Sequence, residues 1–222
     1  MSTHPSSHRI PVAADAAIFT IRKDELCILL IQMKKDPFKD QWALPGGLLE
    51  GNETSKEAVE RILRDQTGVT DAYLEQLMTF DDPTRDPLGR VVSIAYFALV
   101  PFEKITLKTT EKYGDIRWWP IKKLPTLAYD HASITKVAVD RLRAKLEYAN
   151  VAWSLLPHEF PLRLLQQTYE VILGKPLDKR NFLKKVLMLG LLEPTGKKEG
   201  GAHRPAMLYR FKRRKAGVIS LL

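Results

Sequence analysis

The first part of the chain is dominated by β-rich apolar runs, with one early helical segment. Residues 12–21 and 26–33 are such runs, and the polar Arg22–Glu25 stretch between them predicts a hairpin. Thr54 as an N-cap and Gly68 as a terminator predict a helix over residues 55–67. Mixed strands with few helices indicate an α/β or α+β domain built on one sheet. Further strand-like runs lie at residues 73–80, 91–101 and 115–120.

Helical spacing replaces this pattern towards the C-terminus. Asp130 is placed to cap a helix over residues 131–147, whose apolar positions recur every four residues. Pro161 begins a third helix, and Asp178 begins a fourth that runs to about Leu189. Helix, short Gly/Pro turn, helix is the helix-turn-helix pattern. Two short strand-like runs around a Gly/Lys-rich loop follow and are typical of a wing.

Composition places the chain among globular proteins. Of its 222 residues, 45% are hydrophobic and 27% are charged, which excludes global disorder. No uncharged apolar run reaches the ~20 residues of a membrane span, and the N-terminal stretch lacks the apolar segment of a secretory signal. The single cysteine, Cys27, excludes an intramolecular disulfide. We therefore expect a cytoplasmic protein without a membrane partner.

The formal net charge of +9 is concentrated in the last third of the chain. Residues 151–222 hold 14 Lys and Arg against 5 Asp and Glu, which leaves 21 of each sign in the first 150 residues. This asymmetry indicates two modules, the second of which binds a polyanion; a solvated basic surface is the alternative. We expect a tail at 1–9, a first domain at 10–148, a linker at 149–160, a second domain at 161–215 and a tail at 216–222.

The predicted helix that begins at Asp178 has an apolar side and a basic side. At about 100° per residue, one side gathers Phe182, Leu183, Val186, Leu187 and Leu189, and the other gathers Arg180, Asn181, Lys184, Lys185 and Met188. Arginine and lysine donate to guanine, asparagine bonds adenine, and the cations suit phosphates. We expect double-stranded DNA as the partner, with a protein-binding winged helix as the alternative. The expected DNA contacts are Lys179, Arg180, Asn181, Lys184, Lys185 and, in the wing, Lys197, Lys198, His203 and Arg204.

The first domain carries a spaced motif. Gly47, Glu53, Arg61, Leu63, Gly68 and Val69 match six of the nine specified positions of the Nudix box, G-x5-E-x7-R-E-U-x-E-E-x-G-U with U aliphatic. The preceding Trp42–Gly47 segment also resembles the family's entry loop. The resemblance covers roughly residues 10–148. It implies the Nudix α/β/α sandwich with a mixed sheet, and an ancestry in cleaving nucleoside diphosphates linked to another moiety.

The three mismatches with the Nudix box fall on one helical face. Ile62, Asp65 and Gln66 are spaced i, i+3 and i+4, where the family carries carboxylates that gather divalent cations against the pyrophosphate. The formal charge of −3 has become −1, because Ile62 offers no ligand and Gln66 only a neutral carbonyl. We therefore expect no catalytic residues, no metal and no required cofactor, although slow hydrolysis through Asp65 and Glu53 stays open.

Loss of the metal need not remove the pocket. The Gly46–Gly47 backbone can donate to a phosphate, and Arg85 and Arg90 offer guanidiniums for phosphate or ribose. The two arginines can equally form salt bridges with Asp81, Asp82 or Asp86, and both alternatives stay open. The expected effector-binding residues are Gly46, Gly47, Glu53, Arg61, Arg85 and Arg90.

The whole chain resembles the Nudix-related transcriptional regulators of NAD metabolism, the NrtR family. Tyr169–Phe182, Leu189–Thr195 and His203–Ala206 are similar to that family's helix-turn-helix, recognition-helix exit and wing, and Asp86–Ser93 and Tyr129–Ala132 resemble its first domain. The resemblance implies a homodimeric bacterial repressor of NAD biosynthesis or salvage genes that binds a palindromic operator and is released by ADP-ribose. The alternatives are an active hydrolase of the ADP-ribose pyrophosphatase type with an accessory nucleic-acid-binding domain, and a protein-interaction adaptor.

Overall fold

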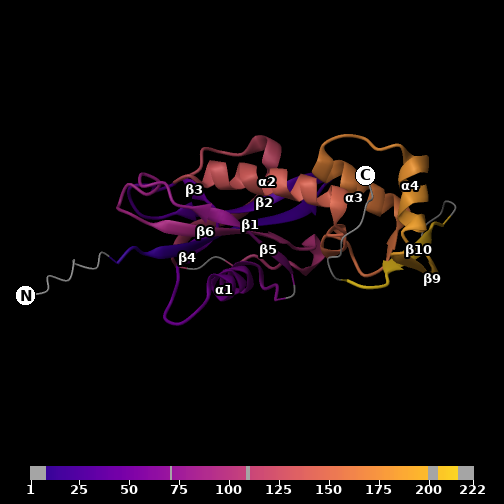
Figure 1. Ribbon diagram of the computed structural model, residues 1–222, viewed down its shortest axis with the longest axis horizontal. Coiled ribbons are helices and arrows are strands. Elements are labelled where there is room, and N and C mark those ends of the chain that lie inside the picture. Colours follow the sequence, from indigo (N-terminus) through magenta and orange to yellow (C-terminus); the bar gives the residue numbers. More distant parts are fainter. Residues whose placement is uncertain (1–8, 71, 109–110, 200–204, 215–222) are drawn as a thin grey trace, which may run out of the picture.

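The computed structural model describes residues 9–70, 72–108, 111–199 and 205–214, which form two domains placed end to end (Figure 1). The larger domain holds a seven-stranded sheet between helices. The smaller domain packs helices against a three-stranded sheet.

The large sheet mixes parallel and antiparallel strands. Its strands are β1 (Val12–Arg22), β2 (Glu25–Met33), β3 (Trp42–Ala43), β4 (Gly46–Leu48), β5 (Tyr73–Phe80), β6 (Val92–Leu99) and β7 (Tyr113–Pro120). The order is β3-β2-β1-β6-β5, with β4 paired to β1 and β7 paired to β2. β1 and β6 are parallel, from Val12 opposite Val92 to Phe19 opposite Leu99. The other strand pairs of this sheet are antiparallel.

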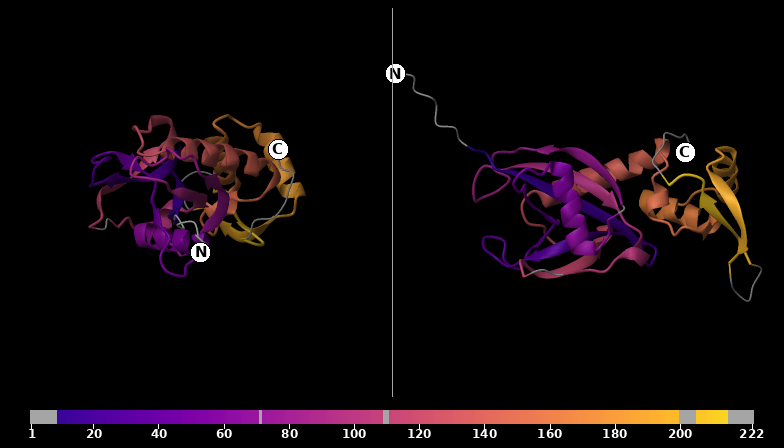
Figure 2. Two further views of the ribbon diagram at one scale, coloured as in Figure 1. Left: turned by 60° about the vertical axis from the view of Figure 1, so that its left-hand side comes forward. Right: turned by 90° about the horizontal axis from the view of Figure 1, so that it is seen from below.

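The large sheet is buried on both faces because α1 (Ser55–Thr67) and α2 (His131–Tyr148) cover opposite sides (Figures 1 and 2). Successive side chains of a strand point to alternate faces, so Ile18 of β1 packs in the cluster under α1 and Phe19 in the cluster under α2. Both side chains are fully buried, and each such burial is worth about 1.5–3 kcal/mol. The predicted α/β/α sandwich with a mixed sheet is confirmed.

The hairpin and the first helix lie where their local signals predict them. Lys23 and Asp24 both have positive φ, 49° and 59°, as a two-residue hairpin turn of matching twist requires. Thr54 forms a capping box with Glu57, and Gly68 ends α1 with φ 72°. The three further predicted strands are β5, β6 and β7, each within two residues of its predicted ends.

The smaller domain has the element order of a winged helix. Its elements are β8 (Phe160–Pro161), α3 (Leu162–Leu173), α4 (Lys179–Met188), β9 (Leu192–Lys198) and β10 (Met207–Phe211). The strands pair in the order β8-β10-β9, and Asp178 caps α4 by accepting from the Asn181 backbone N–H at 2.8 Å. α4, β9 and β10 form the outer end of this domain, away from the large sheet (Figure 1). Short 3-10 turns complete the chain: η1 (Phe102–Lys104), η2 (Ile121–Lys123) and η3 (Ala152–Ser154).

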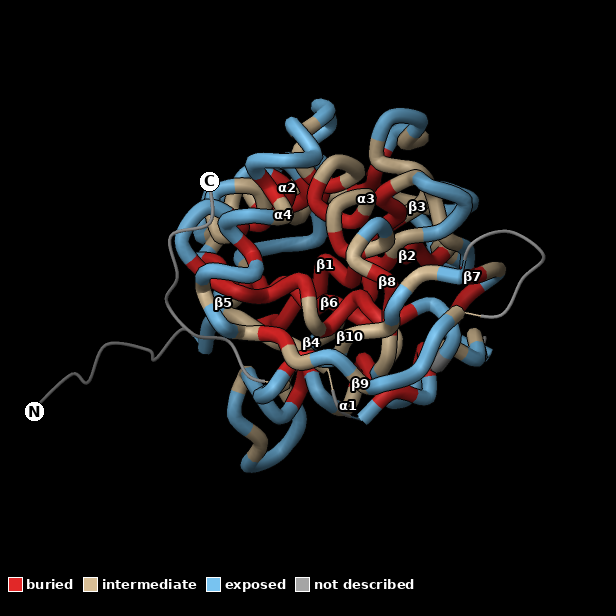
Figure 3. Tube along the Cα trace, turned by 90° about the vertical axis from the view of Figure 1, so that its right-hand side faces the viewer, coloured by how far each residue is buried: buried red, intermediate tan, exposed pale blue. Residues whose placement is uncertain are grey.

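Residues 149–160, predicted as a linker, are packed between the domains. Val151 and Leu156 are buried there, and one cluster of buried side chains runs through this segment from Leu146 of α2 to Tyr169 of α3. Figure 3, seen from the winged-helix end, shows buried stretches of the small domain in front of the buried strands of the sheet. The two domains therefore share a continuous core.

Cys27 is buried in β2 within an apolar run, as a small core residue. Among the helices that the structure describes, none combines the length and apolarity needed to cross a bilayer.

Candidate functional site

A buried cluster of charged side chains lies where β1, β6 and the start of α2 meet. Asp15 of β1 accepts a hydrogen bond from the Ser93 hydroxyl at 2.6 Å and another from the Arg85 guanidinium at 3.3 Å. Arg85 also donates twice to Asp130, at 2.9 and 2.7 Å. Each buried charge therefore has an opposite charge within hydrogen-bond distance, the condition under which burial of ions is tolerated.

His131 completes the cluster and helps to set its protonation. Its Nδ1 accepts the Leu44 backbone N–H at 2.9 Å, and its Nε2 lies 3.7 Å from Asp15. Burial alone would raise the pKa of Asp15, but His131 and the other partners outweigh burial and lower that pKa. Burial alone would likewise lower the pKa of Arg85, but Asp130 and Asp15 outweigh it and raise that pKa. Asp15 and Arg85 are thus both ionised at neutral pH.

Of the two alternatives for Arg85, the structure shows the ion pair, with partners that the sequence did not indicate. Arg85 pairs with Asp15 and Asp130 and not with the neighbouring loop aspartates. Asp130 stands at the N-cap position of α2, but its side chain makes no capping hydrogen bond because it faces Arg85. The predicted helix start is therefore confirmed, but the capping hydrogen bond of the Asp130 side chain is not formed. Arg90 donates to the backbone carbonyl of Asp81 at 2.7 Å.

A first pocket, of about 290 Å³, opens beside the charged cluster. Gly46, Gly47, Tyr129 and His131 are among the residues that line it. Gly46 is required because Asp15 passes so close that a Cβ on residue 46 would lie 2.0 Å from Asp15 Oδ1. Polar and charged groups beside the Tyr129 ring suit a ligand that has both a sugar and an aromatic base, such as a nucleotide.

A second pocket, of about 410 Å³, lies along α1 on the Nudix-box face. Arg61, one of its lining residues, is held by carboxylates: it donates to Glu53 at 3.0 and 2.6 Å and lies 3.4 Å from Glu50. The hydrogen bond from Arg61 lowers the pKa of Glu53. The two predicted effector residues of the box therefore bind each other across the loop that leads into α1.

The residues at the metal positions of the Nudix box do not fit a divalent cation. Ile62 is buried and offers no oxygen, and Gln66 Oε1 is a buried atom without a hydrogen-bond partner among the described residues. The Asp65 carboxylate is half-exposed and lies 3.5 Å from Arg64. Over the described ranges, no group of three or more acidic, histidine or cysteine side chains is placed to hold a metal ion. Magnesium needs several hard, charged oxygens, and of the three metal positions only Asp65 supplies a carboxylate.

α4 turns its basic side to solvent. Phe182 and Val186 are buried against the domain, as predicted. Leu187, predicted on the apolar side, is instead 50% exposed, because it lies about 140° around the helix from Phe182. Met188 is 76% exposed. The exposed positions of α4 are Lys179, Arg180, Asn181, Lys184, Lys185, Leu187 and Met188.

The predicted wing contacts are described only in part. Lys197 Nζ forms an ion pair with Glu159 at 3.0 Å, and Lys198 is exposed. His203 and Arg204 lie outside the described residues. β9 and β10 place the two lysines on the strand that leads to the wing tip.

Asp15, Lys112 and His131 line the pockets although the sequence did not single them out. A charged residue inside the apolar β1 run is a signal for Asp15, because a buried carboxylate needs partners. His131 lies in the Tyr129–Ala132 segment, noted only as a family similarity. Lys112 stands in a polar loop with no motif around it, so its place was not accessible from the sequence.

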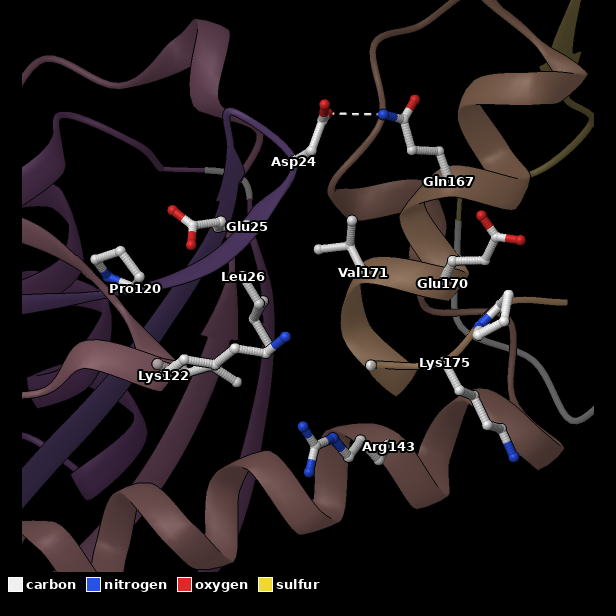
Figure 4. A pocket seen from close by; sticks show the side chains of 13 residues that line it. Asp24, Glu25, Leu26, Pro120, Lys122, Arg143, Gln167, Glu170, Val171 and Lys175 are labelled. Carbon is white, nitrogen blue, oxygen red and sulfur yellow. Dashed lines mark hydrogen bonds between the residues drawn. The ribbon is translucent and has the colours of Figure 1, made fainter.

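A third pocket, of about 340 Å³, lies between the two domains and is lined by residues of both (Figure 4). Asp24, at the tip of the β1–β2 hairpin, accepts a hydrogen bond from Gln167 of α3 at 2.7 Å. Arg143 of α2 donates to the backbone carbonyl of Ile172 at 3.0 Å, in the last turn of α3, where carbonyls lack helical partners. These polar contacts and the shared core attach the winged helix to the larger domain.

The fold and its pockets define a Nudix domain joined to a winged helix. Residues 10–141 match the NUDIX domain family, and residues 152–211 match the NrtR DNA-binding winged helix domain. The second match begins at η3, inside the segment predicted as a linker.

Relatives of known class show the family. The chain is 36% identical over 204 residues to the ADPR responsive transcriptional repressor NtrR of Acinetobacter baylyi, which covers 90% of this chain and 81% of that protein. Shewanella oneidensis NrtR complexed with a 27mer DNA has a TM-score of 0.81 at 35% identity, over 90% of this chain and 93% of that chain. The NUDIX domain of the same protein complexed with ADP ribose has a TM-score of 0.54 at 32% identity, over 60% and 89%. An ADP-ribose pyrophosphatase of Methanocaldococcus jannaschii is 39% identical over 116 residues, 52% of this chain and 67% of that protein. The chain belongs to the NrtR family.

Proposed function

We propose that the protein is a transcriptional repressor of NAD biosynthesis or salvage genes, with ADP-ribose as its effector. The observation that carries the proposal is the joining of a basic, outward-facing α4 to a Nudix pocket whose metal positions do not fit a cation. Such a pocket binds a nucleotide and releases it without hydrolysis, as a sensor must. The ADPR responsive repressor and the DNA and ADP-ribose complexes among the relatives support the same assignment.

The DNA-binding unit is a homodimer in this proposal. Two recognition helices related by a two-fold axis read half-sites about one helical turn apart, so the operator is palindromic. Arg180 and Lys184 lie four residues apart on the exposed face of α4, where they reach one groove together. The domain boundaries at residues 148 and 161 and the effector residues Gly46, Gly47, Glu53, Arg61, Arg85 and Arg90 belong to the same proposal.

Fluorescence anisotropy tests the proposal directly. The protein is titrated onto duplexes from its own genomic neighbourhood, with and without ADP-ribose. We expect one palindrome to bind far more tightly than scrambled DNA and to be released by ADP-ribose. If about six phosphates are neutralised, the affinity falls with salt with a log–log slope of about −5. Specific binding that ignores ADP-ribose would refute the effector and leave the regulator.

A double variant tests the role of α4. Arg180→Ala with Lys184→Ala should cost a few kcal/mol of specific binding, since individual base contacts are worth ~1–3 kcal/mol. Arg64→Ala with Lys56→Ala is the matched control, because it removes the same two charges from exposed positions of α1. An adaptor that binds only proteins would show the same DNA affinity in both double variants.

An active hydrolase with an accessory basic domain is the second candidate, favoured by the match to an ADP-ribose pyrophosphatase. That reading requires magnesium-dependent release of AMP from ADP-ribose, abolished by Glu53→Gln. We expect no such release, because one carboxylate at position 65 cannot replace the three of the box. AMP formation by the wild type that Glu53→Gln removes would favour the hydrolase.

A further inference from the structure

The first and second pockets meet along one wall. Gly46, Gly47 and Leu48 of β4, together with Lys112 and Tyr113, line both pockets. If one ligand occupies both pockets, the central part of that ligand must therefore lie beside these shared residues. ADP-ribose has that construction, because its pyrophosphate stands between an adenosine half and a second ribose.

Lys112 supplies an uncommitted positive charge at this wall. Its Nζ lies 5.3 Å from the centroid of the Tyr113 ring and 3.5 Å from where a Cβ of residue 47 would stand. Within the described part of the chain no carboxylate lies within salt-bridge distance of Lys112, whereas Arg61 beside it is held by Glu53 and Glu50. The absence of a side chain on Gly47 keeps the space beside the ammonium open.

We propose that Lys112 binds the pyrophosphate of the effector without a metal ion, so that its ammonium group provides the charge that a divalent cation provides in a metal-dependent Nudix site. This inference rests on the proposed function, because the diphosphate is that of ADP-ribose. It follows from the misfit of Ile62, Asp65 and Gln66 to a cation, which leaves the anion without a metal partner. A lysine ammonium forms charge-assisted hydrogen bonds with phosphate oxygens as a compact point charge.

The replacement of a divalent cation by the Lys112 ammonium group also explains why the effector is bound but not cleaved. A divalent cation both neutralises the phosphates and activates a coordinated water. An ammonium group neutralises charge and donates hydrogen bonds, but it has no coordination site for an attacking water. The pocket thereby keeps affinity for a diphosphate and loses the means to hydrolyse it.

Calorimetric titration of the full-length protein tests this inference, with ADP-ribose and inorganic pyrophosphate as separate probes in EDTA and in magnesium. We expect ADP-ribose affinity to be unchanged within about twofold by EDTA. Lys112→Met should weaken both probes about tenfold or more, the effect of losing a charge-assisted hydrogen bond, and Lys112→Arg should restore most of it. Lys108→Met is the matched control, since Lys108 is exposed and lines neither pocket.

The outcomes separate this inference from the proposed function. Unchanged ADP-ribose affinity in Lys112→Met, at an unchanged melting temperature, overturns the role of Lys112 and leaves the repressor intact. A requirement for magnesium overturns the metal-free subsite. Pyrophosphate binding that depends on Lys112 in a protein that ignores ADP-ribose supports the subsite and refutes the effector.

Discussion

At the scale of single residues, Asp15 organises the first pocket. It lies in the apolar strand β1, where an unpaired charge would cost several kcal/mol. Ser93, Arg85 and His131 compensate it, and Arg85 extends the cluster to Asp130 at the start of α2. One carboxylate therefore connects the pocket floor to the helix that leads towards the winged helix.

Asp15→Asn should lower the free energy of unfolding by about 3–5 kcal/mol at neutral pH, because Arg85 loses a buried partner. The pKa of Asp15 is lower in the folded protein than the ~3.9 of an unfolded chain. The contribution of the carboxylate is therefore complete above about pH 4 and is lost as the pH falls through the folded pKa. Urea unfolding between about pH 6 and pH 3 should show the gap between wild type and variant closing.

A surface ion pair provides the control for that experiment. Asp140 pairs with Lys136 at 2.7 Å, and both side chains are exposed. Asp140→Asn should change the free energy of unfolding by about 0.5 kcal/mol or less. A gap for Asp15→Asn that stays constant down to pH 3 would contradict the ionised, partnered state of Asp15.

Two adjacent glycines should respond differently to a methyl group. Gly46→Ala places a Cβ 2.0 Å from Asp15 Oδ1 and 3.0 Å from the Ala14 carbonyl, whereas the nearest atom to a Cβ at Gly47 is Lys112 Nζ at 3.5 Å. Gly46→Ala should therefore cost about 1–3 kcal/mol of stability, as overpacking does, and Gly47→Ala much less. Thermal unfolding of the two variants measures the difference, and equal melting temperatures would show that β4 and β1 are not held at this spacing.

At the scale of elements, local signals were sufficient for the hairpin, α1 and α4. Thr54, Gly68 and Asp178 act through neighbours within a few residues, so the sequence displays both partners of each contact. The pairing of Arg85 with Asp130 joins residues 45 apart in the chain, and no local pattern reports it. It also withdraws Asp130 from capping, so a local rule failed because a distant partner competed for the same carboxylate.

The exposed face of α4 carries apolar side chains beside its lysine and arginine side chains, so it can contact apolar as well as polar groups of the bases. Arg180, Lys184 and Met188 recur every four residues and form one exposed row, with Leu187 next to it. In a major groove the apolar partner available to such a side chain is the methyl group of thymine. Met188→Ala should weaken operator binding about three- to fivefold, the effect of one buried methylene-sized contact.

Replacing operator thymines by deoxyuridine, which lacks the methyl group, isolates that contact in anisotropy titrations. The loss from Met188→Ala and the loss from deoxyuridine at the contacted step should not add, because each removes the same interaction. Met78→Ala, at an exposed methionine of β5, is the control and should leave operator affinity unchanged. Additive losses on every deoxyuridine duplex would contradict a methyl contact by Met188.

At the scale of the whole molecule, α2 connects the effector pocket to the DNA-binding domain. Asp130 and His131 at its start bind the charged cluster, and Arg143 near its end donates to the last turn of α3. Its 18 residues span ~27 Å. Because the packed segment 149–160 continues the same core, a shift of α2 cannot be absorbed by a loose linker. An effector changes DNA affinity only through differential binding to two arrangements, and α2 contacts both the charged cluster beside the first pocket and α3 of the DNA-binding domain.

Arg143→Met should therefore weaken the coupling between the two ligands while leaving each of them able to bind. Methionine keeps an apolar side chain of similar length in the third pocket, but it cannot donate to the Ile172 carbonyl. The measured quantity is the factor by which saturating ADP-ribose lowers operator affinity. Reciprocity requires the same factor for the effect of operator on ADP-ribose affinity, so both titrations must show the same decrease if α2 carries the coupling.

Arg141→Met provides the matched control, because Arg141 lies on the same helix but pairs with Glu75 inside the larger domain at 3.3 Å. Its coupling factor should equal that of the wild type. A decrease confined to Arg143→Met would place the coupling at the contact between α2 and α3. If both variants keep the wild-type factor in both titrations, the contact between Arg143 and the Ile172 carbonyl is not the route by which the effector lowers operator affinity.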